Sequence, residues 1–193
     1  MLGGVFNPPH IGHMVCAQEA YWQLDLDGVA LMPVGAPSHR EIEMDPGADT
    51  RVRLCEAAGE GAEWLTVSRV EVDRPGDTFT VDTLQQLADS ERGNEYVFVL
   101  GSDQALHLES WREPGRVLQL AQVAIAERAG VPMTEVHDVV GRLGGEGRVS
   151  TFTMPRIDVS STEVRERVAA GRPYRFLVPE RVADLIESEG LYR

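Results

Sequence analysis

The sequence contains no lysine: all 18 of its arginine-plus-lysine cations are arginines, against 31 aspartates and glutamates. The formal net charge of −13 disfavours non-specific binding to nucleic acid. We attribute the missing lysine to codon bias in a GC-rich genome. Its absence still excludes a P-loop lysine, so any bound phosphate must be held by arginine, histidine, hydroxyl or backbone N–H groups.

Cysteines and long hydrophobic runs are also scarce. Two cysteines, Cys16 and Cys55, are too few for a disulfide framework, so a reducing, cytoplasmic location is expected. No apolar run approaches the ~18 residues that span a bilayer, and no secretory signal is recognisable at the N-terminus. A length of 193 residues suits one compact domain, with a helical part from about residue 160 to the end.

Strand-like and helix-like segments alternate along the chain. Short apolar or alternating segments predict strands at Val29–Pro33, Val67–Val72, Tyr96–Leu100 and Gln122–Ala126. Helical patterns cover 11–24, 50–58, 81–90, 116–120, 134–143, 161–170 and 179–189. This alternation predicts an α/β fold, a doubly wound parallel sheet with helices on both faces. Because such sheets bind ligands beyond the carboxyl ends of their strands, we looked for chemistry in the turns that follow strands.

The turn that contains Gly3, Gly4, His10 and His13 is the most informative. Its glycines permit close approach to the backbone, and its two histidines, three residues apart, can point the same way at a helix start. Because a helix N-terminus favours anions, the turn favours polyphosphate binding. The spacing leaves open a zinc site completed by Cys16, or two structural histidines.

Two later turns have weaker signals. Gly101-Ser102-Asp103 follows a predicted strand, although serine and aspartate are common at helix starts for capping alone. Ser160 and Glu163 fit a capping box at the start of a helix. Arg165 lies near the positive end of that helix, where a bound anion would offset its charge. We interpret this segment as a second phosphate clamp.

Together these segments resemble a known superfamily. The segment from Gly3 to His13 resembles the GGTFDPxHxGH signature of nucleotidyltransferases with the HxGH motif, and Ser160 to Arg165 resembles their SSTxIR motif. Within that superfamily the chain resembles bacterial nicotinate-nucleotide adenylyltransferases. The marks of that branch are Pro37-Ser38-His39-Arg40, Thr78-Phe79-Thr80, Gly101-Ser102-Asp103, Trp111 and the ending Gly190-Leu191-Tyr192.

The resemblance implies a Rossmann-like fold with a C-terminal helical segment, forming one nucleotidyltransferase domain over residues 1–193. It implies transfer of AMP from ATP to nicotinate mononucleotide by direct in-line displacement, giving nicotinate adenine dinucleotide and pyrophosphate, a step of NAD biosynthesis. The expected cofactor is Mg²⁺, bound mainly through the ATP phosphates without protein metal ligands. Nucleic acid and membrane are not expected partners, and a homo-oligomer is compatible with the sequence.

The same resemblance assigns site residues by motif position. It implies catalytic roles for His10, His13 and Arg165. The implied ATP-binding residues are Gly3, Gly4, Val5, Phe6, His10, His13, Gly101, Ser102, Asp103, Ser160, Ser161, Thr162 and Arg165. The implied acceptor-binding residues are His39, Arg40, Phe79, Thr80, Asp103, Trp111 and Arg128.

The sequence departs from the family pattern at Val5, Asn7, Thr78 and Phe79, which stand where the family has threonine, aspartate, serine and tyrosine. None of these changes removes a cation or an imidazole. Only two residues precede the double glycine, so we expect either an unusually short first strand or a start codon placed late.

Other function classes remain open at this point. The phosphate motifs are shared across the superfamily, so they also fit an adenylyltransferase that acts on nicotinamide mononucleotide or phosphopantetheine. A non-catalytic nucleotide-binding regulator is the non-enzyme alternative. We disfavour it because such a protein would be expected to lose an imidazole or the clamp arginine, whereas His10, His13 and Arg165 are all present.

Overall fold

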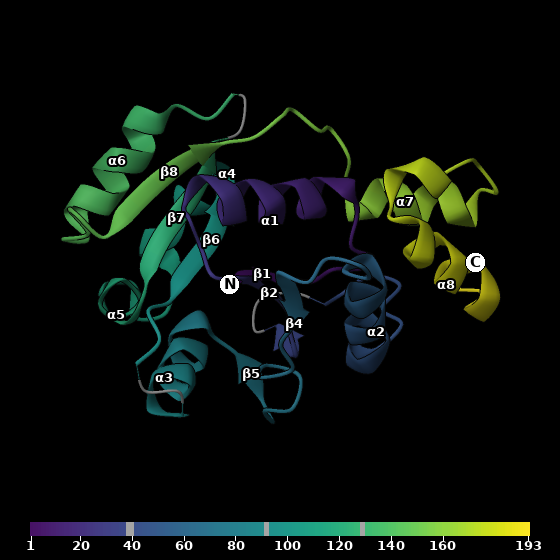
Figure 1. Cartoon of the computed structure of the whole chain (residues 1–193), viewed down its shortest axis with the longest axis horizontal. Helices are drawn as coiled ribbons and strands as arrows, with labels where there is room; N and C mark the ends of the chain where they lie inside the picture. Colours follow the sequence, from purple (N-terminus) through teal and green to yellow (C-terminus); the bar gives the residue numbers. More distant parts are fainter. Residues whose placement is uncertain (38–40, 91–92, 128–129) are drawn as a thin grey trace.

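The computed structural model describes residues 1–37, 41–90, 93–127 and 130–193. At its centre lies a six-stranded parallel sheet in the order β4-β2-β1-β6-β7-β8 (Figure 1). The strands are β1 (Leu2–Gly4), β2 (Val29–Pro33), β4 (Leu65–Val67), β6 (Val97–Gly101), β7 (Gln122–Glu127) and β8 (Val149–Thr153). Counted along the chain, this is the order 3-2-1-4-5-6 of a doubly wound Rossmann sheet. The order reverses between β1 and β6, the point at which such sheets bind ligands.

The helices that lie between strands of this sheet in the sequence are α1 (Ile11–Gln23), α2 (Ala48–Ala58), α3 (Thr80–Ser90), α4 (Ser102–Ala105), α5 (Pro114–Leu120) and α6 (Met133–Arg142). Two more helices, α7 (Ser161–Ala169) and α8 (Glu180–Glu189), follow β8. Two 3-10 turns, η1 (Leu108–Ser110) and η2 (Arg175–Leu177), join some of them. A second, two-stranded sheet pairs β3 (Ala36–Pro37) with β5 (Asp77–Thr78).

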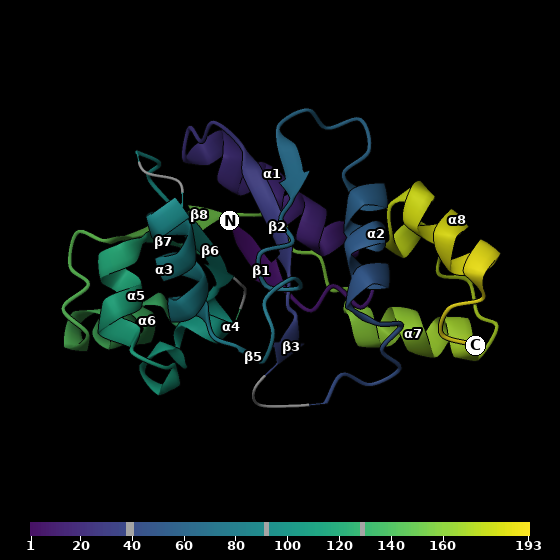
Figure 2. The same cartoon turned by 90° about the horizontal axis from the view of Figure 1, so that it is seen from below.

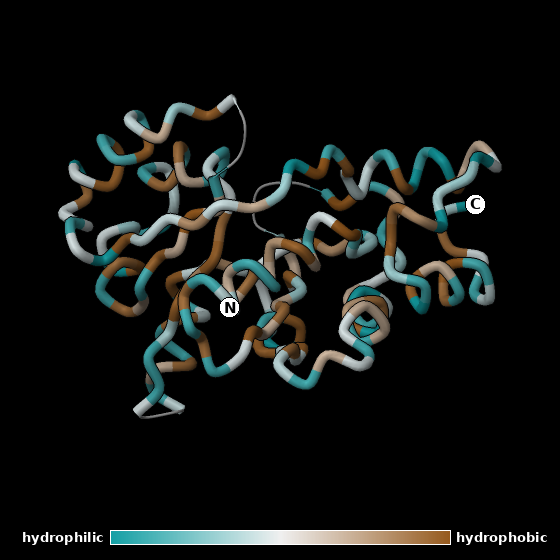
Figure 3. The backbone as a smooth tube through the Cα atoms, turned by 45° about the horizontal axis from the view of Figure 1, so that its top comes forward, coloured by the Kyte–Doolittle hydropathy of each residue, from teal (hydrophilic) through white to brown (hydrophobic). Residues whose placement is uncertain are grey.

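Successive residues of the strands face opposite sides, which divides the core into two clusters. Val99 and Ala124 pack in the cluster that contains α1, whereas Leu100 and Ile125 pack in the cluster that contains α3, α5 and α6. Helices therefore cover both faces, as the sequence predicts. A third cluster joins α2 to α7 and α8, which form one end of the molecule (Figures 1 and 2). Along the helices, hydrophobic and hydrophilic residues alternate as in amphipathic helices (Figure 3).

The first strand is short and lies in the middle of the sheet. Leu2 to Gly4 pair with residues 31–33 of β2, and Leu2 also pairs with Val99 of β6. The Met1 amine donates to the Val97 carbonyl oxygen at 2.7 Å, and burial lowers the pKa of that amine to about 6. Neighbouring strands thus hold the beginning of this chain on both sides.

The predicted strand at Val67–Val72 is wrong. Strand β4 ends at Val67, and the chain then turns, with the Asp73 N–H donating to the Arg69 carbonyl at 2.9 Å. The alternating pattern has another cause, because Val70 packs against the core and Glu71 is buried within the turn.

The sequence also did not predict β8, an edge strand in which only Phe152 is fully buried. Among the described residues, no helix has both the length and the apolar character needed to cross a bilayer.

Candidate active site

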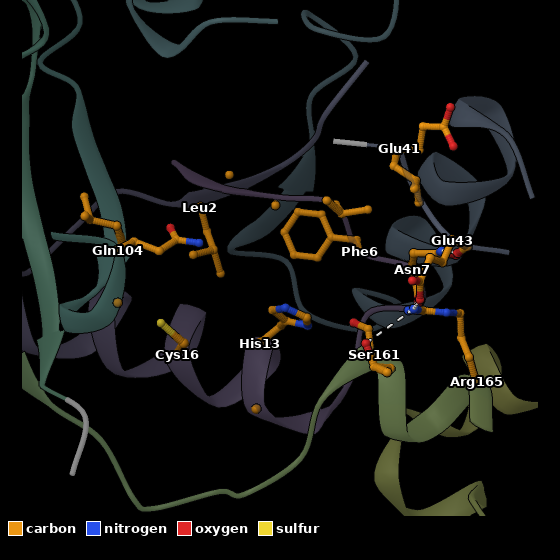
Figure 4. Close-up of a pocket in the computed structure, with 18 residues that line it drawn as sticks. Leu2, Phe6, Asn7, His13, Cys16, Glu41, Glu43, Gln104, Ser161 and Arg165 are labelled. Carbon is orange, nitrogen blue, oxygen red and sulfur yellow. Dashed lines mark hydrogen bonds and ion pairs between the residues drawn. The ribbon is translucent and has the colours of Figure 1, made fainter. Parts of the chain in front are cut away.

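A cavity of about 510 Å³ lies where the strand order reverses, beyond the carboxyl ends of β1 and β6 (Figure 4). Its wall combines the turn after β1, the start of α4, the segment 41–43 and the start of α7. The predicted ATP-binding residues that line it are Gly3, Gly4, Val5, Phe6, His13, Gly101, Ser161, Thr162 and Arg165. The fold therefore brings together segments that are about 150 residues apart in the sequence. We call this the phosphate cavity.

The two glycines of the first turn lie against phenylalanine rings. A Cβ on Gly4 would lie 3.1 Å from the Phe6 ring, and a Cβ on Gly3 would lie 3.3 Å from the Phe98 ring. Phe6 itself has a φ of 51°, a left-handed conformation that costs a non-glycine residue ~1–2 kcal/mol. Burial of its ring offsets that cost, because Phe6 is almost completely buried. Small residues at Gly3 and Gly4 let this turn fold tightly over the core.

His10 and His13 stack on each other at the start of α1, with ring centroids 3.7 Å apart. His13 Nδ1 accepts a hydrogen bond from the His10 backbone N–H at 3.2 Å. A neutral His13 with an accepting Nδ1 has its proton on Nε2, which makes Nε2 a donor. Figure 4 shows the His13 ring rising from α1 beneath Phe6, and His13 lines the phosphate cavity. His10 is buried beside it and lines a neighbouring cavity instead.

The start of α7 is bonded directly to the turn after β1. The Ser161 hydroxyl donates to the Pro8 carbonyl at 2.8 Å, and Arg165 Nη1 donates to the Asn7 carbonyl at 2.9 Å. Arg165 is buried, and its Nε has no hydrogen-bond partner among the described residues. The predicted capping box is present in part, since the Ser160 hydroxyl accepts from the N–H of residue 163 at 3.1 Å. The two helix starts and the guanidinium therefore surround one cavity, a setting that favours an anion.

Asn7 connects the phosphate cavity to the C-terminus of the chain. Its Oδ1 accepts from the Tyr192 hydroxyl at 2.8 Å, and its Nδ2 donates to the Glu43 carbonyl at 2.9 Å. The side chains of Asn7 and Tyr192 are both buried. Burial raises the pKa of the Tyr192 phenol, which is therefore a neutral donor. An aspartate at this position could not donate to Glu43. Asparagine in place of the family's aspartate thus fits this position, because its amide side chain both accepts a hydrogen bond from Tyr192 and donates one to Glu43.

A second cavity, of about 450 Å³, adjoins the first and shares the wall formed by Gly3, Gly4, Val5 and Gln104. We call it the acceptor cavity. Phe79, Thr80 and Trp111, all predicted to bind the acceptor, line it. Trp111 is partly buried and meets the Phe98 ring edge to face at 6.0 Å.

Three polar groups at the acceptor cavity were not singled out from the sequence as ligand-binding groups. The Arg112 guanidinium lies 4.8 Å above the Phe79 ring, and the buried Thr78 hydroxyl has no hydrogen-bond partner among the described residues. Glu71, also in the wall, accepts from the Thr83 hydroxyl at 2.8 Å, while Arg74 donates to that hydroxyl at 2.9 Å. Burial raises the pKa of the Glu71 carboxyl. Of these groups, Thr78 had a sequence signal as part of the Thr78-Phe79-Thr80 motif, whereas Arg112 and Glu71 had none.

A third cavity, of about 420 Å³, lies on the other side of His10 and Gly12. The extended segment 154–160, which runs from β8 past α1 to α7 in Figure 1, forms most of its wall. Met154, Pro155 and Ile157 form an apolar part of this wall, which also contains the charged residues Glu127, Arg156, Asp158 and Glu163. The sequence does not predict this cavity, because the segment 154–160 has no regular pattern.

Other predicted site residues lie elsewhere. Neither Ser102, which is fully buried at the start of α4, nor Asp103, which is exposed, lines the phosphate or acceptor cavity. Ser160 lines the third cavity. His39, Arg40 and Arg128 fall outside the described residues. Within the described ranges, no three His, Cys, Asp or Glu side chains come together to hold a metal ion, and this includes the proposed zinc group with Cys16.

Comparisons with known proteins show the family of this chain. A family profile described as cytidylyltransferase-like matches residues 1–167. The chain is 34% identical over 194 residues to a protein of Rubrobacter xylanophilus named "Probable nicotinate-nucleotide adenylyltransferase", covering 100% of this chain and 91% of that relative. It is 37% identical over 201 residues to a Roseiflexus castenholzii protein of the same name, covering 100% and 96%.

A solved structure shows the same fold. The Plasmodium falciparum nicotinic acid mononucleotide adenylyltransferase complexed with NaAD superimposes with a TM-score of 0.81, at 15% identity, covering 99% of this chain and 95% of that one. At this identity the likeness concerns the fold alone. Sequence relatives and profile together carry the assignment, and the chain belongs to the nicotinate-nucleotide adenylyltransferase family of cytidylyltransferase-like nucleotidyltransferases.

Proposed function

We propose that this chain, as one nucleotidyltransferase domain over residues 1–193, transfers AMP from ATP to nicotinate mononucleotide. The observation that supports this best is the pair of adjoining cavities with a common wall. One is surrounded by helix starts, an imidazole and a buried guanidinium, whereas the other is lined by aromatic rings. Such a pair suits a polyphosphate and a pyridine nucleotide that meet at the wall between them.

In this proposal the phosphate cavity holds the ATP phosphates. His13 Nε2 donates to oxygens of the α-phosphate and the leaving pyrophosphate, and the neighbouring His10 supports its ring. Arg165 and the N-terminus of α7 hold the β and γ groups. The cavity beyond His10 then suits the adenine ring, because it adjoins the phosphate cavity at Gly12 and has apolar side chains such as Met154 and Ile157 in its wall.

The reaction needs little acid–base chemistry. A phosphate monoester has a second pKa of about 6, so the attacking oxygen of nicotinate mononucleotide is largely ionised at neutral pH. That oxygen forms a bond to the α-phosphorus as the bond from the α-phosphorus to the bridging oxygen breaks, and pyrophosphate leaves with the electron pair. The chain therefore contributes positioning and charge stabilisation, through His13, Arg165 and the helix starts.

The acceptor cavity supplies donors for a pyridine carboxylate. Trp111 and Phe79 offer stacking surfaces for the ring. The Thr78 hydroxyl, the backbone around Thr80 and the Arg112 guanidinium can donate to carboxylate oxygens, whereas the N–H₂ of a nicotinamide would face these donors.

We expect Mg²⁺ as the cofactor, held mainly by the phosphate oxygens of ATP. When bound, it would supply positive charge that offsets the charge of the phosphates.

The decisive experiment measures pyrophosphate release from ATP with nicotinate mononucleotide, nicotinamide mononucleotide and phosphopantetheine as acceptors. We expect kcat/KM to favour the nicotinate compound over the nicotinamide compound by at least ~10²-fold, equivalent to about 2.7 kcal/mol. Comparable rates with both mononucleotides would indicate dual specificity. A rate with phosphopantetheine alone would support that alternative, and no rate with any acceptor would support the regulator.

A pair of tryptophan variants tests the acceptor cavity. Trp111→Ala should raise the KM for the acceptor far more than the KM for ATP, because stacking acts on the pyridine ring. Trp22→Ala is the matched control, since Trp22 is 78% exposed on α1. Equal effects of Trp111→Ala on both substrates would contradict the assignment.

A further inference from the structure

Arg51 is the largest fully buried side chain of the described residues, with only 1% of its surface exposed. It lies in α2, outside the cavities described above. Its Nε donates to the Asp45 carboxylate at 3.0 Å. Burying a guanidinium has a desolvation penalty, and an apolar side chain of similar volume often stabilises a protein as well or better. Stability alone therefore gives a weak account of an arginine here.

The other bonds of Arg51 all go to backbone carbonyls of cavity-wall segments. Nη1 donates to the carbonyls of Val34 at 2.7 Å and Val5 at 3.2 Å, and Nη2 donates to the carbonyl of Gly35 at 3.1 Å. Val5 lines both the phosphate cavity and the acceptor cavity, and Val34 lines the acceptor cavity. One planar group thus bonds to the turn after β1 and to the turn after β2.

Asp45 extends this connection to a third segment. It follows residues 41–43, which line the phosphate cavity, and it also accepts from the Gly47 N–H at 3.0 Å at the start of α2. Because the donors of a guanidinium have fixed directions, Arg51 sets the positions of all three segments relative to one another.

Gly35 shows how tightly the second of these segments is held. A Cβ at Gly35 would lie 2.2 Å from the Glu71 carbonyl oxygen and 3.2 Å from the Thr78 hydroxyl. The chain therefore passes in direct contact with the opposite wall of the acceptor cavity, which Glu71 and Thr78 line. A shift of Gly35 would move that wall as well.

We propose that Arg51 is a positioning residue for adenylyl transfer, which sets the separation between the ATP phosphates and the acceptor by bonding to Val5, Val34, Gly35 and Asp45. The proposal rests on the function proposed above. In-line attack requires the reacting atoms to lie about 3–3.5 Å apart, and a misplacement of ~1 Å can cost ~10²-fold in rate. When Arg51 is altered, each substrate can still contact the residues that line its own cavity. The turnover number should therefore change more than either KM.

The test compares Arg51→Lys with Arg53→Lys. Arg53 lies two residues further along α2, is exposed, and pairs with Glu189 of α8 rather than with the cavity walls. Steady-state kinetics with ATP and nicotinate mononucleotide are measured per folded molecule, with the folded fraction determined by circular dichroism. Arg51→Lys should lower kcat by about 10- to 100-fold with less than about a threefold change in either KM. Arg53→Lys should retain the kcat of the unaltered protein.

Asp45→Asn keeps the test decisive if Arg51→Lys does not fold. This variant retains the guanidinium and its carbonyl partners but removes the charge that holds the third segment, and we expect a smaller loss of kcat with both KM values nearly unchanged. The proposal is overturned if Arg51→Lys and Asp45→Asn both retain the wild-type kcat. If Arg51→Lys does not fold, a wild-type kcat in Asp45→Asn alone overturns it. It is also overturned if Arg53→Lys loses as much kcat as these variants do. An unaltered protein without activity on any acceptor would instead refute the proposed function, and the role of Arg51 with it.

Discussion

Replacing Tyr192 by phenylalanine removes one oxygen atom that connects the C-terminus to the phosphate cavity. The phenol donates to Asn7 Oδ1 at 2.8 Å, between side chains that are 6% and 1% exposed. The direction of this bond is fixed, because the Asn7 amide nitrogen already donates to the Glu43 carbonyl. Phenylalanine keeps the aromatic ring in the cluster formed by α2, α7 and α8, so no cavity is created there.

The expected loss of stability follows from the acceptor left behind. Asn7 Oδ1 would be buried without its donor, and an unsatisfied buried polar group costs about 1–3 kcal/mol. For a domain of this size each kcal/mol corresponds to about 2–4 °C in Tm, so the Tm should fall by about 2–12 °C. Urea unfolding with an unchanged m-value would show that the folded state alone is affected.

The same variant should weaken ATP binding. The backbone of Asn7 accepts from Arg165, and its side chain holds the segment at Glu43, so a loosened Asn7 disturbs two parts of the phosphate cavity. Tyr174→Phe is the matched control, because Tyr174 is partly buried in the same cluster but its hydroxyl has no hydrogen bond to the described residues. If the two variants have the same stability and the same KM for ATP, the reasoning is refuted.

Three further outcomes test the site. His13→Ala should lower kcat by ~10²-fold or more while circular dichroism shows an intact fold, and near-normal turnover would exclude the proposed role. Arg165→Lys should raise the KM for ATP more than that for the acceptor, since a point charge does not replace a fork; equal effects would count against the clamp. Burial raises the pKa of Glu71 above its ordinary value near 4.5, so the wild type loses stability as pH rises above that value, whereas Glu71→Gln cannot ionise. In urea unfolding, the free energy of unfolding of Glu71→Gln minus that of the wild type should increase from about pH 4 to about pH 8. If this difference stays constant over that range, the pKa of Glu71 is not raised by folding.

Local patterns predicted most of the regular structure. The apolar run Val29–Pro33 coincides with β2, and the predicted helix at 11–24 differs from α1 by one residue. The pattern at Val67–Val72 misled because alternation records which side chains are buried, and a turn can bury the same ones. Here Arg69 binds Asp73 four residues later, with Nη2 at 2.8 Å from its carboxylate, and that bond favours a turn over a strand.

The hydrogen bonds that connect the segments of the candidate site could not be predicted from the sequence. Arg51 bonds mostly to backbone carbonyls, which every residue possesses, so its partners at Val5, Val34 and Gly35 cannot be inferred from residue types. The bond between Tyr192 and Asn7 spans 185 residues, and no periodic pattern reaches that far. Motifs thus predicted several of the groups that line the two cavities, whereas the groups behind them required the fold.

The charge at the phosphate cavity explains how, under the proposed function, an acidic chain without lysine would hold a triphosphate. Glu43 lies at the cavity and contacts Arg165 at 3.6 Å, but it is 82% exposed, so water screens the pair and its contribution is small. A triphosphate has more charge and several acceptor oxygens, and it can replace Glu43 at the guanidinium at little cost. The starts of α1 and α7 add directed N–H donors without any formal charge. A net charge of −13 is therefore no obstacle to phosphate binding, because the local donors, and not the overall charge, determine what this cavity holds.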